Sequence, residues 1–583
     1  MHCLIPIALD IMHHSSKLLL ALLLALQAAA VAPTVATTSS PSSGSGAGSG
    51  TGPGVVAAGS GTGPLRVEQV PCRPSAGADA TATCLQAALD AALPGDVIEV
   101  PFTGEPWVVS SPLILRRDGV TLHFLPGVVL EAQRGQFHGE TDCLLTMGGG
   151  AAPVAGVTVR GSPGARLRMH RADYANSSLY SKAEWRHGLQ LVSVRDTLVE
   201  SLRIELSGGD EIYVDQATNT TIRNVDMADN YRQGISVVAA DGLVVEDCLM
   251  HGTNGTNPQA GLDIEPNRPQ DELVNITFSR CTSYNNTGNQ LDVFPTCLRY
   301  RVCGQAERAS AVKPGQPPRH DLRSPTRQAE LLAMMAPPPA TPRPMSIHFE
   351  DCVTTSFSTF GSDAGGSSDG LILSGVFTPG IIIVDRFRAV RNSGSGISIG
   401  KAAGVGAATI LIRNSTLEDN NPDEHEWRGI QCSALHFLTL ILSEAPNVTQ
   451  FGEVTLSDLH VNVASQLGHN KSWCTTVGGG KITGIKGDVN IHSAIGCPLL
   501  PASFGAGATG IDLEVTCVAT NPPPCANASW WWVSTNGDQC FQKCSSSSQA
   551  HGYTGRCLCG GATLDSACLA GLHCVGGECH ARR

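Results

Sequence analysis

Seven short segments of one pattern recur along the middle of this sequence, and this repeat constrains the fold more than any other feature. Each segment has four residues: a leading residue that is often glycine, an apolar residue, a variable residue and a second apolar residue. The segments are Gly188–Leu191, Glu211–Val214, Gly234–Val237, Gly261–Ile264, Gln290–Val293, Gly370–Leu373 and Gly396–Ile399. Their spacings are 23, 23, 27, 29, 80 and 26 residues. A second strand-like segment recurs between them, at 196–204, 219–227, 241–249, 272–280, 380–388 and 408–416.

A period of about 20–30 residues built from short strands predicts a β-solenoid, in which successive turns of the chain stack as coils. One coil cannot bury its own apolar face, whereas stacked coils bury continuous rows of inward side chains. The spacing of 80 residues fits one ordinary coil plus an insertion at 297–345, which is rich in proline and basic residues and is predicted to loop out. Leucine-rich repeats share this period, but their pattern is absent.

The chain before the repeats is predicted to become ordered near Leu65. Residues 79–92 have an amphipathic pattern closed by a Pro-Gly pair, which predicts a helix that covers the open edge of the first coil. Cys84 lies in this helix and Cys72 just before it, so a local disulfide is expected. Short apolar runs predict strands at 96–100, 107–115, 120–132, 157–161 and 165–169.

The repeats resemble those of right-handed parallel β-helix proteins with the pectin-lyase-like fold, over roughly residues 65–500. Four stretches are similar to a bacterial-type subgroup of such proteins: SKAEWRH at 181–187, SGGDEIYV at 207–214, NYRQGISV at 230–237 and GLDIEPN at 261–267. The resemblance implies an all-β, single-stranded, right-handed parallel β-helix, and its carbohydrate-active relatives imply chemistry on glycans. The Asn-Thr-Asp, Asp-Asp, Gly-His-Gly and Arg-Ile-Lys blocks of polygalacturonases do not occur here in order, nor does a convincing calcium site of the pectate-lyase kind.

The first 64 residues are predicted to lie outside the β-helix. Residues 1–32 contain the apolar run LLLALLLALQAAAVA and are interpreted as a signal peptide, because this run is short for a membrane span. Residues 33–64 are rich in Ser, Gly and Pro and predict a flexible linker. We therefore expect a secreted or extracellular protein without a membrane span. Nine sequons are candidate N-glycan sites, at Asn176, Asn219, Asn254, Asn275, Asn285, Asn414, Asn447, Asn470 and Asn527.

Cysteine is abundant, with 21 residues, and nine of them fall within 517–583. In a secreted chain this density predicts disulfide bonds, and 517–583 is interpreted as a small module stapled by them. Zinc binding by this module is the rival interpretation, and we predict no metal site. Trp530, Trp531 and Trp532 lie in the module and either stack on sugar rings or pack the module itself.

Two aspartates occupy equivalent positions in neighbouring repeats. The middle residues of the seven segments point outward: Gln190, Tyr213, Ser236, Asp263, Asp292, Ile372 and Ser398. Asp263 and Asp292 are therefore expected side by side on one face, with backbones about 5 Å apart. Paired carboxylates shift apart in pKa, so that one keeps a proton near neutral pH and the pair can act as general acid and base. A structural ladder of polar residues is the alternative.

Further polar residues cluster around this pair. Glu265 shares the face of Asp263 and is a third candidate catalytic residue. Residues before each strand are expected to stack as well, which brings two arginines suited to a uronate carboxylate or a sulfate into the same groove. The candidate substrate-binding residues are Arg186, His187, Asp210, Glu211, Tyr213, Arg232, Gln233, Asn267 and Arg268.

Three functions remain open for such a chain. The first is a polysaccharide hydrolase using Asp263 and Asp292, and the second is a lyase or epimerase that neutralises a uronate with Arg232, Arg186 or Ca²⁺. The third is a glycan-binding scaffold of the cell surface or extracellular matrix without catalysis. No other cofactor is implied, the protein is expected to be a monomer, and the net charge of −12 argues against nucleic acid as a partner.

Overall fold

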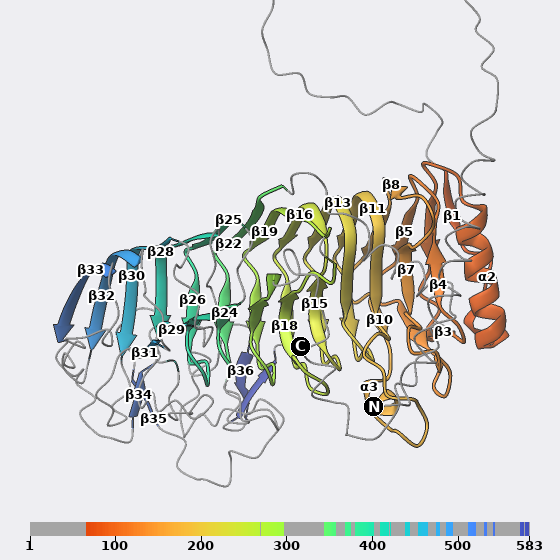
Figure 1. The fold of residues 1–583 in the computed structure, drawn as a ribbon. Helices are drawn as coiled ribbons and strands as arrows, with labels where there is room; N and C mark the ends of the chain where they lie inside the picture. Colours follow the sequence, from red (N-terminus) through yellow and green to blue (C-terminus); the bar gives the residue numbers. More distant parts are fainter. Residues whose placement is uncertain are drawn as a thin grey trace, which may run out of the picture. The chain divides into compact units, whose positions relative to one another are not determined.

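The computed structural model describes residues 66–268, 270–295, 343–356, 368–374, 379–400, 408–418 and 420. Beyond these it describes the segments 438–442, 453–463, 474–477, 485–493, 511–519, 530–532, 540–542, 572–575 and 578–581. The predicted signal peptide, the linker and nearly all of the predicted insertion lie outside the described residues. Within them, stacked parallel strands form one continuous β-helix from β1 to β33 (Figure 1).

The strands of the β-helix form three faces, each a ladder of parallel strands from successive coils. Face A consists of β4 (Leu113–Leu115), β7 (Leu145–Gly148), the first parts of β11 (Leu189–Glu200) and β13 (Ile212–Arg223), β15 (Gln233–Val237), β18 (Ala260–Ile264), β21 (Leu291–Val293), β24 (Leu371–Ser374), β27 (Ile397–Gly400), β29 (Leu438–Leu442) and β31 (Cys474–Val477).

Face B begins with the first strand of the β-helix and also includes its last one. It consists of β1 (Val67–Gln69), β2 (Val97–Val100), β5 (Thr121–Phe124), β8 (Val154–Ala155), β9 (Thr158–Gly161), the later parts of β11 and β13, β16 (Ala240–Glu246), β19 (Leu273–Ser279), β22 (Met345–Glu350), β25 (Gly380–Asp385), β28 (Thr409–Glu418), β30 (Val454–Val463), β32 (Ile485–Ser493) and β33 (Ile511–Ala519).

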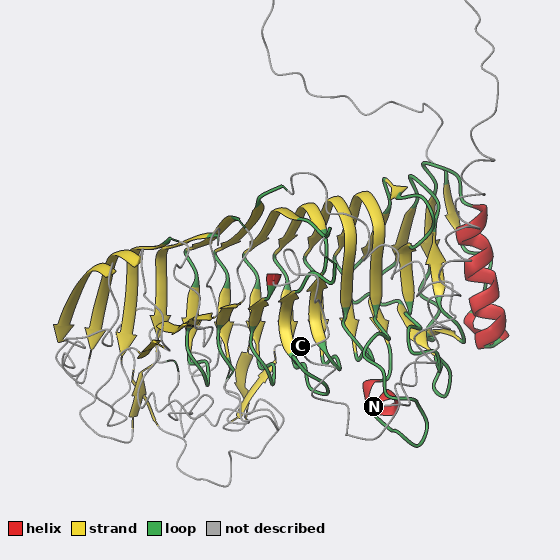
Figure 2. Cartoon of the chain, in the orientation of Figure 1, coloured by secondary structure: helices red, strands yellow, loops and turns green. Residues whose placement is uncertain are grey.

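Face C is made of three- and four-residue strands and the end of β28. It consists of β3 (Trp107–Val109), β6 (Val129–Ala132), β10 (Arg166–Arg168), β12 (Arg203–Glu205), β14 (Asp226–Ala228), β17 (Leu249–His251), β20 (Thr282–Tyr284), β23 (Val353–Thr355) and β26 (Arg388–Val390). Each coil thus passes through the three faces in the order A, B, C. Figure 2 shows the strands of the stacked coils in yellow and the loops that connect them in green.

The inward row of face A confirms the repeat alignment made from the sequence. The seven predicted inward residues are mutual register partners and are at most 2% exposed: Leu189, Ile212, Ile235, Leu262, Leu291, Leu371 and Ile397. Each coil buries this row against the next coil, which is how a chain with few apolar residues per coil obtains a continuous core.

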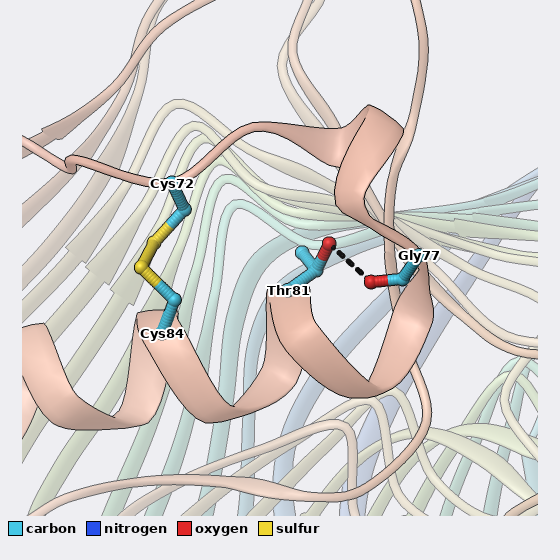
Figure 3. The surroundings of a disulfide bond; sticks show 4 residues. All are labelled: Cys72, Gly77, Thr81 and Cys84. Carbon is cyan, nitrogen blue, oxygen red and sulfur yellow. Dashed lines mark hydrogen bonds between the residues drawn. A yellow bond between two sulfur atoms is a disulfide. The ribbon is translucent and has the colours of Figure 1, made fainter.

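Helix α2 (Ala78–Ala91) covers the first coils, as predicted, and the short 3-10 helix η1 (Pro74–Ala76) precedes it. Its buried residues include Leu85 and Leu89, and the helix contacts β3 and β4. The side chain of Gln86 hydrogen-bonds both backbone groups of Ile114, at 2.8 and 2.9 Å, and so satisfies part of an open strand edge. The predicted disulfide links Cys72 to Cys84 and ties the preceding segment to α2 (Figure 3).

Four other cysteines correct the expectation that the abundant cysteines form disulfides. Cys143, Cys248, Cys281 and Cys352 are unpaired and buried inside the β-helix. The last three stack in register at the corner between faces B and C, because each stands just before a strand of face C. There they act as small apolar side chains of the core.

One boundary lies elsewhere than predicted. The parallel sheet continues through β33, so the β-helix extends past residue 500 and includes Cys517, where the tail module was expected to begin. At the insertion, β22 starts at Met345, where the loop was predicted to end, and Arg343 just before this strand pairs with Glu272 of the neighbouring coil.

Four short strands and one short helix complete the described elements. β34 (Trp530–Trp532) pairs antiparallel with β35 (Cys540–Gln542), and β36 (Leu572–Val575) with β37 (Glu578–Ala581). The disulfides predicted for the tail lie outside the described residues. α3 (Arg171–Tyr174) is a single turn. None of the described helices is both long and apolar enough to cross a bilayer.

Candidate functional site

The predicted carboxylate pair lies in the middle of face A. Asp263 of β18 is the direct register partner of Asp292 of β21, and Ser236 of β15 is the partner of Asp263 on the other side. Tyr213 and Ile372 continue the same row. The predicted register is confirmed for all seven outward positions, since the alternation of inward and outward side chains follows directly from strand geometry.

Asp263 and Asp292 are more deeply buried than predicted. Asp263 is only 3% exposed and Asp292 only 5%, so they do not lie in an open groove. The side-chain amide of Gln233 donates a hydrogen bond to Asp263, and Asn289 donates one to Asp292 at 3.2 Å. Oδ1 of Asp292 is buried and has no hydrogen-bond partner among the described residues. Neighbouring coils thus shield both carboxyls, which outward register alone could not reveal.

Burial decides the protonation of the pair. It raises the pKa of Asp263 well above the ordinary value, and the nearby carboxyls of Glu265 and Asp292 raise it further against the opposing effect of Arg232. Burial also raises the pKa of Asp292 to about 7, although the hydrogen bond from Asn289 favours its charged form. Two buried carboxylates in contact cannot both be charged without a large penalty, so the pair holds a proton near neutral pH.

Arg232 supplies the positive charge of the cluster. Its guanidinium lies 3.6 Å from Asp210, 3.7 Å from Glu184 and 3.8 Å from Glu265, and it donates a hydrogen bond of 2.7 Å to Gln233. Burial lowers the pKa of Arg232, but the surrounding carboxylates outweigh this effect and raise it. The carboxylate distances exceed normal hydrogen-bond lengths, and Nε has no hydrogen-bond partner among the described residues. The guanidinium is held in place with donor capacity to spare.

Asp210 and His187 form a second buried pair beside Arg232. Oδ2 of Asp210 lies 3.4 Å from Nδ1 of His187 and accepts a hydrogen bond of 2.8 Å from Ser236. The backbone N–H of Asp210 also donates to Nδ1, at 3.0 Å, so this nitrogen is an acceptor and carries no proton. Burial lowers the pKa of His187 to about 3 and raises the pKa of Asp210 to about 7. The ring of His187 stacks on Tyr213, with centroids 4.8 Å apart.

Glu265 marks the accessible side of the cluster. Its side chain is 40% exposed, whereas that of Arg232 is 17% exposed. Both side chains come from residues that flank the buried aspartates on face A, so a ligand that approaches this face meets Glu265 and Arg232 first.

Several predicted residues lie apart from the cluster. Arg186 is completely buried, donates to the backbone oxygens of Phe137 and His138, and lies over the ring of Tyr180. Glu211 is also completely buried, and its carboxyl accepts a hydrogen bond from the backbone of Ser207. For both, the corner before the strand turns the side chain away from the outer face, so neither is placed to contact a substrate there.

Arg268 and Asn267 lie at the edge of the site. The guanidinium of Arg268 pairs with Asp215 and with Asp271, the latter at 2.7 Å. Asn267 is exposed, and its backbone N–H donates to Asp271 at 2.9 Å. Arg268 therefore has structural partners of its own next to the cluster.

Sequence reasoning missed two residues of the site. Asp369 lies two residues before β24 and raises the pKa of Asp292. It continues the row of residues before the strands to which Asn289 belongs, so extending that row by one coil would have found it. Glu184 approaches Arg232 from the loop before β11, and its hydroxyl partner Thr256 comes from a distant loop. No repeat pattern predicts such a contact.

The remaining predicted sites lie on the periphery or beyond the description. Asn176, Asn219, Asn275, Asn285 and Asn414 are exposed, Asn254 is partly exposed, and Asn447, Asn470 and Asn527 lie outside the described residues. Trp530–Trp532 form β34, and their side chains are not among those described. Within the described part of the chain, no three His, Cys, Asp or Glu side chains are placed to hold a metal ion together.

Comparisons with known proteins bear on the fold. A family model described as "Right handed beta helix region" matches residues 156–300. No curated protein matches the chain. The A-module of the mannuronan C-5 epimerase AlgE6 from Azotobacter vinelandii has a similar structure, with TM-score 0.43, 13% identity and coverage of 76% of this chain and 96% of that module.

Two further solved structures have comparable likeness. They are the catalytic unit of a GH87 α-1,3-glucanase from Streptomyces thermodiastaticus, with TM-score 0.37, 12% identity and coverage of 80% and 71%, and the surface adhesin PfbA of Streptococcus pneumoniae, with TM-score 0.41, 8% identity and coverage of 71% and 86%. At these identities the likeness concerns the course of the backbone alone. The match over residues 156–300 and the parallel three-faced coils together show that the fold is a right-handed β-helix.

Proposed function

We propose that this protein is a secreted polysaccharide hydrolase that uses Asp263 and Asp292 as its acid–base pair. The observation that carries the proposal is the pair itself, two carboxyls on adjacent coils that burial keeps partly protonated. Two carboxyl groups of opposite protonation are the chemical requirement for cleaving a glycosidic bond. The resemblance to the pectin-lyase-like fold implies a carbohydrate substrate.

The surroundings of the two aspartates suggest how they divide the work. Asp263 has three acidic neighbours, namely Glu265, Asp292 and Asp210, and is the residue that keeps the proton. Asp292, whose pKa rises to about 7, accepts a hydrogen bond from Asn289 that favours its charged form, whereas the hydrogen bond from Gln233 does not keep the pKa of Asp263 from rising well above its ordinary value. In the proposed reaction Asp263 therefore protonates the glycosidic oxygen, and Asp292 acts in its charged form as the second carboxylate.

Unsatisfied polar atoms in the cluster support a site built to receive a ligand. Oδ1 of Asp210, Nε of Arg232 and Oδ1 of Asp292 are buried without hydrogen-bond partners among the described residues. Each such atom destabilises a folded chain by about 1–3 kcal/mol, so three in one cluster call for an explanation. Water in the free protein, or hydroxyl groups of a bound sugar in its place, would satisfy such atoms.

The charge of Arg232 favours an acidic polysaccharide. Its terminal nitrogen lies 3.8 Å from Glu265 at the accessible side of the cluster, where the partly exposed guanidinium can bind a carboxylate or a sulfate. An anionic group there would also interact favourably with the buried cation when the nearby aspartates are protonated. We therefore propose uronate-containing or sulfated polymers as the first substrates to test.

A lyase or epimerase is the second candidate, and the same guanidinium favours it. In that reaction Arg232 neutralises the uronate carboxylate, and a neighbouring group removes the proton from the adjacent carbon. A bound Ca²⁺ would take part only in this case. A lyase leaves an unsaturated sugar that absorbs in the ultraviolet, whereas a hydrolase leaves only new reducing ends.

The test is a digestion screen of the secreted, full-length protein on neutral and acidic polysaccharides, with reducing ends and ultraviolet absorbance measured in parallel. New reducing ends without absorbance, lost in Asp263→Asn, support the hydrolase. A rise in absorbance moves the assignment to a lyase. Binding of a glycan with neither signal and with its sugar configurations unchanged would replace both candidates by a non-catalytic scaffold at the cell surface or in the matrix, whereas a changed configuration would indicate an epimerase.

A further inference from the structure

Three residues far from the face-A cluster meet on face B near the first coils. Glu99 of β2 is the register partner of His123 of β5, and His123 is in turn the partner of Arg160 of β9. Ser162 follows β9 by one residue and lies on the same outer side as Arg160. Stacking of three successive coils thus brings together residues that are 24 and 39 positions apart in the sequence.

The imidazole ring of His123 lies between the side chains of Ser162 and Glu99. Oγ of Ser162 lies 3.0 Å from Nε2 of His123, and Oε1 of Glu99 lies 3.4 Å from Nδ1 of the same ring. Each ring nitrogen therefore faces a different partner, a hydroxyl on one side and a carboxylate on the other. This is the order nucleophile, base, orienting acid that activates a serine, and the first distance is within hydrogen-bond reach.

We propose that Ser162, His123 and Glu99 form a second hydrolytic centre that cleaves carboxylic esters. Ser162 is the nucleophile, His123 the general base and Glu99 the residue that positions the imidazole. This centre is independent of the glycosidase proposed for face A, because it uses other residues on another face.

The charge state of His123 suits this role. Burial lowers the pKa of His123 from its ordinary value, and Arg160 lowers it further, against the opposing effect of Glu99. The ring is therefore neutral near pH 7 and can accept the hydroxyl proton. Nδ1 makes no hydrogen bond among the described residues, and the carboxylate of Glu99, 3.4 Å away, favours by its charge the tautomer in which Nδ1 carries the hydrogen and Nε2 is free to act as base.

The three side chains are partly accessible to solvent. Those of His123 and Glu99 are 16% and 22% exposed, and Ser162 is partly exposed. Gly164, two residues after Ser162, lies against Gly127 of the preceding coil, and neither residue has a side chain to fill this part of the corner. The ring of Phe102 lies against Gly127 and is itself 60% exposed, which offers an apolar surface to the acyl or alcohol part of an ester.

The proposed reaction needs only the ester and water. Oγ of Ser162 attacks the carbonyl carbon while His123 takes its proton, and the positive charge of Arg160 beside the imidazole favours the developing oxyanion. The ester C–O bond then breaks, His123 returns the proton to the leaving alcohol, and an acyl-serine remains. Water, deprotonated by His123, attacks this acyl group and releases the carboxylic acid and the free serine.

The test is covalent labelling of the full-length protein with a fluorophosphonate probe, with the modified peptide located by mass spectrometry. We expect the label on Ser162 and a fall in labelling rate of about 10²-fold or more in His123→Gln, because a positioned base is worth ~10²–10⁴-fold. Hydrolysis of p-nitrophenyl acetate should fall in parallel. Ser193→Ala is the matched control, because the Ser193 hydroxyl donates a hydrogen bond of 2.9 Å to Gln216 and has no imidazole partner among the described residues; this variant should label like the unaltered protein.

Two results would overturn this proposal. One is a probe that leaves Ser162 unmodified in the unaltered protein, a result that does not depend on any variant folding. The other is a labelling rate that His123→Gln leaves unchanged, which would reduce the three residues to a polar ladder. Glu99→Gln tests the positioning role separately: it should lower the plateau rate and shift the pH profile of labelling to lower pH, since Glu99 raises the pKa of His123.

Discussion

Asp263 and Asp292 are register partners on neighbouring coils, and each is at most 5% exposed. Like-charged side chains directly opposite each other in a sheet are unfavourable, and burial makes the repulsion stronger. The pair can persist only if it holds a proton or if Arg232 compensates part of its charge.

Replacing either aspartate should abolish turnover and leave the fold intact. We expect Asp263→Asn and Asp292→Asn each to lower the rate of polysaccharide cleavage by ~10²–10⁴-fold, because each removes one of the two acid–base groups. The thermal midpoint should stay the same or rise, since the like-charge contact is relieved. Asp247→Asn is the matched control, an exposed carboxylate that pairs with Arg280. If the variants lose stability but cleave normally, the pair is a structural ladder.

Stability should fall as the pH rises from about 4 to about 7. The pKa of Asp292 and that of Asp210 are both about 7 in the folded chain, above the ordinary value of 3.8, so the unfolded chain releases these protons first. A shift of this size corresponds to about 4 kcal/mol for one carboxyl taken alone. Urea unfolding measures the free energy of unfolding of the unaltered protein and of Asp292→Asn across this pH range. The free energy should depend less on pH in Asp292→Asn than in the unaltered protein. If the difference in free energy of unfolding between the two proteins is the same at every pH, the pKa of Asp292 is not raised.

Removing the central cation should have a pH-dependent effect. We expect Arg232→Gln to destabilise the fold by about 3–5 kcal/mol at high pH, where the carboxyls around it are ionised, and by less in mild acid, where they can take up protons. Cleavage of acidic polymers should suffer more than cleavage of neutral ones. Arg268→Gln provides the comparison, since Arg268 pairs with Asp215 and Asp271 outside the cluster. Equal losses on both substrate types would argue against substrate binding by Arg232.

The disulfide of the capping helix should stabilise the first coils. Cys72 and Cys84 are 12 residues apart, and a cross-link over a loop of this size is worth about 3 kcal/mol. We expect Cys72→Ser with Cys84→Ser to lower the thermal midpoint and to promote aggregation, because α2 would cover the strand edge less firmly. Light scattering during thermal unfolding measures both effects. An unchanged midpoint would show that the packing of Leu85 and Leu89 holds the helix by itself.

The proline-rich insertion should be dispensable for folding. β21 and β24 are direct neighbours in face A, and β22 stacks on β19, so the coils on either side are already in register without it. Deletion of 305–342, with Arg343 kept for its ion pairs, should preserve secretion and the cooperative melt. Loss of either would show that the insertion packs on the β-helix.

The backbone architecture could be predicted from the sequence because the repeat is local and periodic. Leu262 and Leu291 are equivalent in their segments, and stacking of identical coils makes equivalence in sequence the same as adjacency in space. The same reasoning bridged the 80-residue spacing and placed Leu371 next to Leu291. An expectation based on composition was wrong at Cys281. The abundance of cysteine suggested disulfides, whereas Cys281 is a free thiol inside the corner between faces B and C.

The candidate site was predictable only in part. The register gave the neighbours of Asp263 along face A, yet it did not show that Glu211 turns inward at the corner or that Arg186 is enclosed by the loop around Tyr180. Glu184 reaches Arg232 from outside the repeats, where sequence spacing carries no information about distance.

The sequence by itself determined which residues face outward and which coils are neighbours, because a strand alternates its side chains and a solenoid repeats its coils. Only the tertiary structure decided how deeply Asp263, Asp292 and Asp210 are buried, and therefore that their pKa values rise. It also decided that Ser162 meets His123, since that contact depends on the direction of a turn after β9 and not on the repeat. Solvent exposure and side-chain direction at corners depend on contacts between distant segments, and these are the properties that turn a row of polar residues into a candidate site.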